Sequence, residues 1–88
     1  MKIADYLNTG RAGAVPLRHL EAVTDLDGRV IRQMIANERK KGVPILSDNV
    51  TGYWLSASEE ETNRFLRSMR HRANEIITAC NALEKKGD

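Results

Sequence analysis

The sequence contains a single cysteine, Cys80, and two histidines, His19 and His71. A lone thiol cannot form an internal disulfide, and two histidines so far apart lack the spacing of a zinc site. No nucleophile motif and no phosphate-binding glycine loop lies beside either histidine. We therefore expect no catalytic residues, no metal and no cofactor, and we expect Cys80 to fill a packed interior.

Long apolar runs are also absent. No stretch approaches the roughly 18 apolar residues of a membrane-spanning helix, and the first ten residues, MKIADYLNTG, lack the pattern of a signal peptide. Hydrophobic residues make up 41% of the chain and charged residues 30%, which is typical of a folded, water-soluble domain. We expect a cytoplasmic protein without a membrane partner.

A large excess of one charge is missing as well, since the net charge is only +2. Bulk charge therefore does not indicate a nucleic-acid partner, and any attraction to phosphate must come from a local cluster. Residues 1–56 contain eight Lys and Arg against six Asp and Glu, whereas residues 57–88 contain six of each. A basic surface is expected in the first of these two segments.

Helical spacing predicts three short helices in the first half of the chain. The first covers residues 3–7, before the loop signal Asn8-Thr9-Gly10. The second begins after Pro16, which is tolerated at a helix start because the N–H it lacks would have no partner there. The apolar residues of this second helix are Leu17, Leu20 and Val23.

The third predicted helix follows Asp27, whose carboxylate can accept a hydrogen bond from the first backbone N–H groups, and it ends at Gly42. It is amphipathic, with apolar side chains on one face and polar or basic ones around much of the rest. The apolar face consists of Val30, Ile31, Met34 and Ile35. The outer face consists of Arg29, Arg32, Gln33, Ala36, Arg39 and Lys40.

A β-hairpin is predicted next, with strands at residues 43–46 and 53–55 on either side of a polar turn. Tyr53 and Trp54 point to opposite faces of the second strand, so at least one of them is expected in the core. A long helix then begins near Ser58, which with Glu61 forms a capping-box pattern, and it continues to Lys86.

The long helix carries an apolar stripe whose members are spaced alternately four and three residues apart. Phe65 and Ile77 widen the stripe. Its regular positions are Thr62, Leu66, Met69, Ala73, Ile76, Cys80 and Leu83. The 88 residues are too few for two ordinary domains. From the order of the predicted elements we expect a mainly α fold with a small β-hairpin. It consists of a winged helix-turn-helix domain over residues 1–56 and a long C-terminal helix over residues 57–88.

This order of elements predicts binding to double-stranded DNA. An outward Arg can bond guanine, Gln can bond adenine and the methyl group of Ala can contact thymine, while basic side chains further along can reach phosphates. Asp48, at the tip of the hairpin, is expected to repel the DNA backbone. The predicted contacts are Gly28, Arg29, Arg32, Gln33, Ala36, Arg39 and Lys40 in the third helix, and Asn49 and Thr51 in the wing.

The stretch from Leu20 to Leu55 resembles the winged-helix domain at the N-terminus of biotin operon repressors and small prophage winged-helix proteins. The shared pattern consists of Leu20, Leu26, Ile31 and Ile35 at core positions, the turn Lys40-Lys41-Gly42, then Ile45 and the strand Gly52-Tyr53-Trp54-Leu55. The resemblance implies a bacterial or phage transcriptional regulator that acts by occupying a site. Glu38 departs from the pattern, which usually has leucine there, and no biotin-ligase domain follows, so no biotin role is expected.

Two alternatives stay open. Winged helices also serve as protein-interaction modules, and a solvated basic face does not require DNA. The long helix either folds back over its own domain or packs on a second copy to form a homodimer. The expected dimer interface consists of Ala73, Ile76, Ile77, Cys80 and Leu83. The target sequence, an effector ligand and the choice between activation and repression do not follow from these residues.

Overall fold

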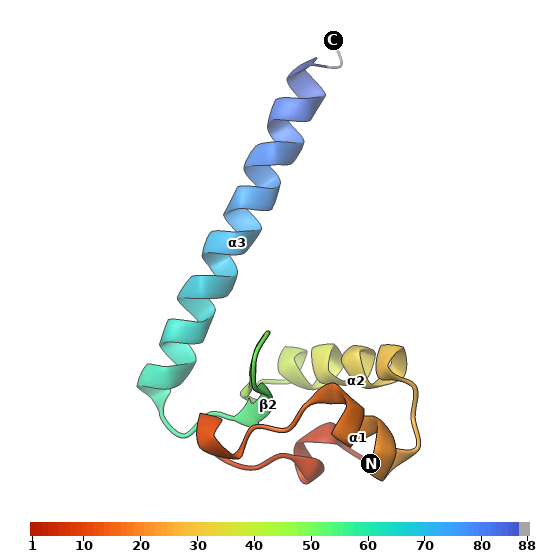
Figure 1. The fold of residues 1–88 in the computed structure, drawn as a ribbon. Helices are drawn as coiled ribbons and strands as arrows, with labels where there is room; N and C mark the ends of the chain where they lie inside the picture. Colours follow the sequence, from red (N-terminus) through yellow and green to blue (C-terminus); the bar gives the residue numbers. More distant parts are fainter. Residues whose placement is uncertain (87–88) are drawn as a thin grey trace.

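The computed structural model describes residues 1–86 and is mainly helical, with a two-stranded antiparallel hairpin and a long C-terminal helix, which confirms the predicted composition (Figure 1). One 3-10 turn replaces the first predicted helix, and a second one lies in a segment predicted as loop. The elements are η1 (Ile3–Tyr6), η2 (Arg11–Gly13), α1 (Leu17–Thr24), α2 (Gly28–Lys40), β1 (Ile45–Asp48), β2 (Gly52–Leu55) and α3 (Glu59–Lys86).

A three-residue turn joins α1 to α2. Asp25 ends α1 in the left-handed conformation, with a φ of 59°, and donates its N–H to the carbonyl of Glu21. The hydroxyl of Thr24 supports the turn by accepting a hydrogen bond from the N–H of Leu26 at 3.3 Å. The carboxylate of Asp27 then accepts the N–H of Arg29 at 2.9 Å, which is the predicted cap of α2.

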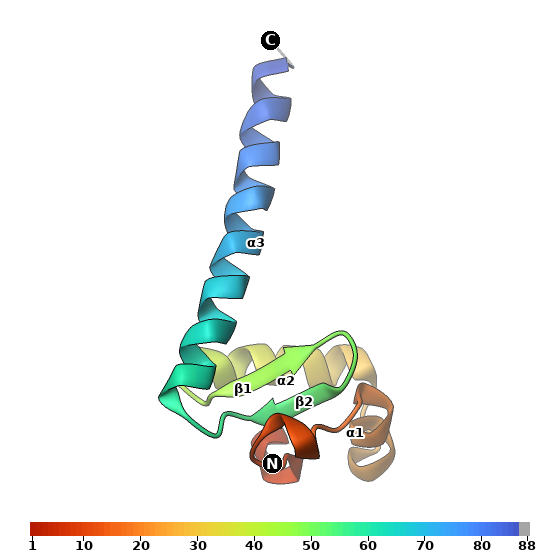
Figure 2. The same ribbon diagram turned by 60° about the vertical axis from the view of Figure 1, so that its left-hand side comes forward.

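The strands β1 and β2 form an antiparallel hairpin (Figure 2), and its two faces have different environments. Ile45 and Tyr53 lie on the face that packs against the main core, whereas Leu46 and Trp54, which are paired across the strands, are both buried on the other face. The strands extend closer to the tip than predicted. The outer edge of β2 is also paired, because Val15 exchanges two backbone hydrogen bonds with Tyr53, at 2.8 and 2.9 Å.

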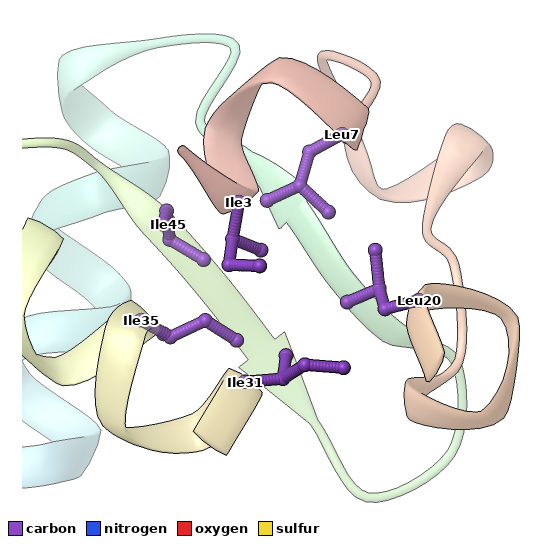
Figure 3. Close-up of a cluster of buried hydrophobic side chains, with 6 residues drawn as sticks. All are labelled: Ile3, Leu7, Leu20, Ile31, Ile35 and Ile45. Atoms are coloured by element: carbon purple, nitrogen blue, oxygen red, sulfur yellow. The ribbon is translucent and has the colours of Figure 1, made fainter. Parts of the chain in front are cut away.

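The core joins η1, α1, α2 and β1 around one cluster of buried side chains (Figure 3). Val23 and Val30, both predicted on apolar faces, are exposed. Val30 precedes Ile31 by one residue and therefore points about 100° away from the centre of the buried face, and Val23 lies at the exposed end of a two-turn helix. The cluster consists of Ile3, Leu7, Leu20, Ile31, Ile35 and Ile45.

The helix α3 leaves the rest of the chain and extends away from it (Figures 1 and 2). The hydroxyl of Ser58 accepts the N–H of Glu61 at 3.1 Å, as the capping pattern predicts. Only the first turns touch the body formed by residues 1–56, and residues 67–85 are exposed. The helix therefore does not fold back over the body, and the expectation that Cys80 fills an interior is wrong for a single copy of the chain.

Candidate nucleic-acid interface

The outer face of α2 displays a set of polar and basic side chains opposite the buried Ile31 and Ile35. Arg29, Arg32 and Gln33 are exposed there, and Lys40 extends the same face by two turns. None of the three cations forms an ion pair with a carboxylate of residues 1–86. Their charged groups are therefore free to contact an anionic ligand. Ala36 lies among them, partly buried.

Asn37 is a member of this face that the sequence analysis missed. The side-chain amide of Gln33 donates a hydrogen bond to Oδ1 of Asn37 at 3.2 Å, and both residues are exposed. Their spacing of four residues would have indicated such a pair. The contact uses one N–H of the Gln33 amide and leaves its carbonyl oxygen and second N–H without a partner in this pair.

Gly28, which was predicted to contact DNA, does not lie on the exposed face of α2. The residue is buried at the crossing of α1 and α2, where an added Cβ would lie 3.0 Å from a methyl of Leu17. Its N–H donates to Oε2 of Glu21 at 3.2 Å and so is already satisfied within the chain. Gly28 therefore permits the close approach of the two helices and offers no group to a ligand.

Arg39 was predicted to contact phosphate, but its guanidinium is directed at the hairpin. Nε donates to the carbonyl of Ile45 at 2.7 Å, and Nη2 donates to the hydroxyl of Ser47 at 3.1 Å. The same group lies 5.2 Å from the centre of the Phe65 ring. Burial lowers the pKa of Arg39 from its ordinary value. Arg39 thus links α2, β1 and α3, and we remove it from the predicted DNA contacts.

The tip of the hairpin is organised by Asp48. Its Oδ1 accepts hydrogen bonds from the backbone N–H groups of Val50, Thr51 and Gly52, and from the hydroxyl of Thr51 at 2.7 Å. Oδ2 forms an ion pair with Nη2 of Arg11 at 2.8 Å. The expected repulsion of DNA by Asp48 is therefore offset, because the charge is satisfied by N–H groups and by an arginine that only the tertiary structure brings to this place.

The two predicted wing residues differ in availability. Asn49 is exposed, whereas the hydroxyl of Thr51 already donates to Asp48 and retains only its lone pairs for a ligand. Between them Val50 is 85% exposed and presents an apolar side chain at the tip. The wing therefore offers Asn49 and the neighbouring Arg11, with Thr51 mainly stabilising the turn.

We expect the contribution of Asp48 to stability to depend on pH. Hydrogen bonds from the backbone and hydroxyl of Thr51 hold the pKa of Asp48 well below its ordinary range. A carboxylate with a lowered pKa stabilises the fold above its unfolded pKa of about 4, and the contribution is lost as the pH falls through the folded pKa. Asp48→Asn should lower the Tm at pH 7, and the difference from the parent should shrink below about pH 4.

Thermal unfolding between pH 7 and pH 3 tests this expectation, with Asp5→Asn as the control because Asp5 is exposed. The control should follow the parent at every pH. A Tm difference between Asp48→Asn and the parent that stays constant over this range would contradict the role assigned to the Asp48 charge.

Comparison of the chain with models of known protein families, with curated proteins and with solved structures found no match. Within the described residues, no three His, Cys, Asp or Glu side chains are grouped closely enough to hold a metal ion. No helix in residues 1–86 has both the length and the apolar character needed to cross a membrane.

Proposed function

We propose that the chain binds double-stranded DNA, with α1, the following turn and α2 acting as a helix-turn-helix and the β-hairpin acting as its wing. The observation that carries the proposal is the outer face of α2, where Arg29, Arg32 and Gln33 are exposed and the two cations are unpaired within residues 1–86. The opposite face of α2 is anchored in the core by Ile31 and Ile35. A helix held in this way can enter the major groove with its polar face outward.

Each member of the proposed interface has a chemical role. Arg29 and Arg32 present guanidinium groups suited to bidentate bonds with guanine, and Gln33 presents an amide suited to adenine. Lys40 is placed to contact a phosphate beside the base-reading residues, and Asn49 to contact a phosphate from the wing. Ala36 is partly buried, and its methyl group can contact the methyl group of thymine.

A homodimer through α3 completes the proposal, because two copies would present two α2 helices to a site with two-fold symmetry. This is the arrangement of a bacterial or phage transcriptional regulator that acts by occupying its site. The rival function, a protein-interaction module independent of DNA, is favoured by one observation: Val50, at the tip of the wing, is apolar and 85% exposed.

Substitutions on α2 test the proposed base contacts. On a duplex selected from a random pool for tight binding, Arg32→Ala should weaken binding by about 1 to 3 kcal/mol, which is roughly a five- to 150-fold rise in Kd. Arg29→Ala and Gln33→Ala should have effects in the same range. Fluorescence anisotropy with a labelled duplex gives the Kd values.

Arg67→Ala is the matched control, since Arg67 is an exposed arginine on α3 outside the proposed interface. Its Kd should stay within about twofold of the parent value, because the substitution removes only a charge that lies away from the proposed interface. If Arg29→Ala, Arg32→Ala and Gln33→Ala all bind as the parent does, α2 is not the recognition helix.

A further inference from the structure

The apolar stripe of α3 is uncovered in a single copy of the chain. Ile76 is 59% exposed and Leu83 is 70% exposed, and Ala73, Ile77 and Cys80 are exposed between them. Contiguous apolar surface of this kind marks an interface in most folded proteins. What covers it can be inferred from the shape of the chain and from the order of side-chain sizes along the helix.

The stripe continues a groove at the base of α3. Thr62, Phe65, Leu66 and Met69 line this groove, which has a volume of about 290 Å³, opposite the segment 42–46 of the body. Because side chains three or four residues apart share one face of a helix, the stripe from Ala73 to Leu83 lies on the same side of α3 as the groove. The stripe therefore lies on the side of α3 whose first turns face the body, and Figure 1 shows that α3 and the body diverge from the base of the helix.

This geometry excludes a parallel pair. In a parallel, in-register pair the two-fold axis runs along the helices, so both bodies would have to occupy the same space between the two α3 helices. In an antiparallel pair the axis crosses the helices, and the bodies lie at opposite ends. We propose that α3 pairs in antiparallel orientation with α3 of a second copy of this chain, so that the C-terminal half of each helix covers the groove of the other copy.

Side-chain sizes fix the register of this pair. The small residues Ala73 and Cys80 alternate along the stripe with the larger Met69, Ile76 and Leu83. When Ala73 lies opposite the partner's Ile76, Cys80 lies opposite the partner's Met69, and every small residue faces a large one. Facing layers of this kind fill space without cavities, whereas a parallel register would place Ala73 against the partner's Ala73 and leave a gap.

Charge favours the same orientation. The segment 62–74 contains Arg64, Arg67, Arg70 and Arg72 and no carboxylate, whereas the segment 75–86 contains Glu75, Glu84, Lys85 and Lys86. Parallel pairing would bring two arginine-rich segments together. Antiparallel pairing places each of them beside a segment whose charges balance, which lowers the repulsion between the helices.

The exposed stripe and the groove set what the pairing must cover. A specific interface buries about 1,000 Å² or more in total, and burying one large aliphatic side chain removes roughly 100 Å² from water. The pairing therefore has to cover both the stripe and the groove on each copy. This inference deepens the homodimer of the proposed function, and it is tested without DNA.

Solution mass and disulfide formation test the pairing. Sedimentation of the parent chain at tens of micromolar should give a dimer, and Ile76→Glu should give a folded monomer, with the fold checked by Trp54 fluorescence. Under oxidation the parent should form no covalent dimer, because the two Cys80 thiols lie about 16 Å apart along the helix axis in this register. Met69→Cys should form a covalent dimer with the native Cys80.

The matched control combines Met69→Cys with Cys80→Ala, which leaves two thiols about 16 Å apart and should stay uncrosslinked. A monomeric parent, a dimer unaffected by Ile76→Glu, a disulfide between the two native Cys80 residues, or no crosslink in Met69→Cys would each overturn the pairing. A monomer that still binds duplex DNA would refute the pairing alone, and an antiparallel dimer that binds no DNA would refute the proposed function alone.

Discussion

Gly52→Ala should destabilise the fold by about 3 kcal/mol or more, the largest effect expected of a single methyl group in this chain. Gly52 begins β2 with a φ of 109°, a conformation that L side chains rarely adopt. An added Cβ would lie 2.2 Å from the carbonyl oxygen of Val15, which is backbone and cannot rotate away. The substitution would therefore separate β2 from the edge segment that contains Val15.

Gly42→Ala separates the backbone strain of a positive φ from the steric clash with Val15. Gly42 has a similar φ of 93°, but an added Cβ would meet no atom within 4 Å. We expect this variant to lose about 1 kcal/mol, from backbone strain alone. Chemical denaturation of both variants and the parent gives the free energies of unfolding. Equal losses in the two variants would show that the contact with Val15 carries no energy.

Glu38→Ala should lower the free energy of unfolding by about 2 to 4 kcal/mol, because it leaves two backbone donors without a partner. Glu38 is buried, and its two carboxylate oxygens accept the N–H groups of Ile3 at 2.8 Å and Ala4 at 3.0 Å. These are the first N–H groups of η1, which no backbone carbonyl of the turn can satisfy. The carboxylate thereby fixes η1 on α2 and holds Ile3 in the core.

Two variants refine the test of Glu38. Glu38→Gln keeps one acceptor oxygen and should show an intermediate loss, since its amide group cannot accept the second N–H. Glu60→Ala removes an exposed glutamate at the start of α3 and should change stability by less than about 0.5 kcal/mol. A loss in Glu38→Ala no larger than that of Glu60→Ala would contradict the role of Glu38 in holding η1.

The elements with local signals were predictable. Asp27 caps α2 and Ser58 caps α3, as expected, because both caps depend on residues within three positions of the helix start. The hairpin was also predicted, although its strands extend closer to the tip. The reason is Asp48, whose hydrogen bonds to the next residues tighten the turn and leave Asp48 and Gly52 paired.

The proposed DNA-binding face of α2 was predictable in its centre and not at its margins. Helical spacing placed Arg29, Arg32 and Gln33 outward, where they are exposed. Helical spacing alone does not reveal which part of the fold is contacted by a residue at the edge of this face. Arg39 lies at this edge and donates a hydrogen bond to the hairpin. The ion pair of Asp48 with Arg11 joins residues 37 positions apart in sequence, and no local pattern indicates such a contact.

Glu38 illustrates the same limit for a buried charge. The side chain is buried, and the partners of its carboxylate are backbone N–H groups 34 and 35 residues earlier. Backbone donors carry no signature in a sequence, because every residue except proline has one. Only the folded arrangement of η1 against α2 reveals that this glutamate caps a turn.

Binding of the parent chain to a random-sequence duplex, measured by fluorescence anisotropy at about 50 mM and about 200 mM salt, tests the DNA-binding proposal most directly. We expect a Kd in the micromolar range at the lower salt concentration and a weakening of roughly ten- to 100-fold at the higher one, since a few phosphate contacts release counterions. No binding at about 100 μM protein in low salt, or an affinity that does not change with salt, would contradict the account.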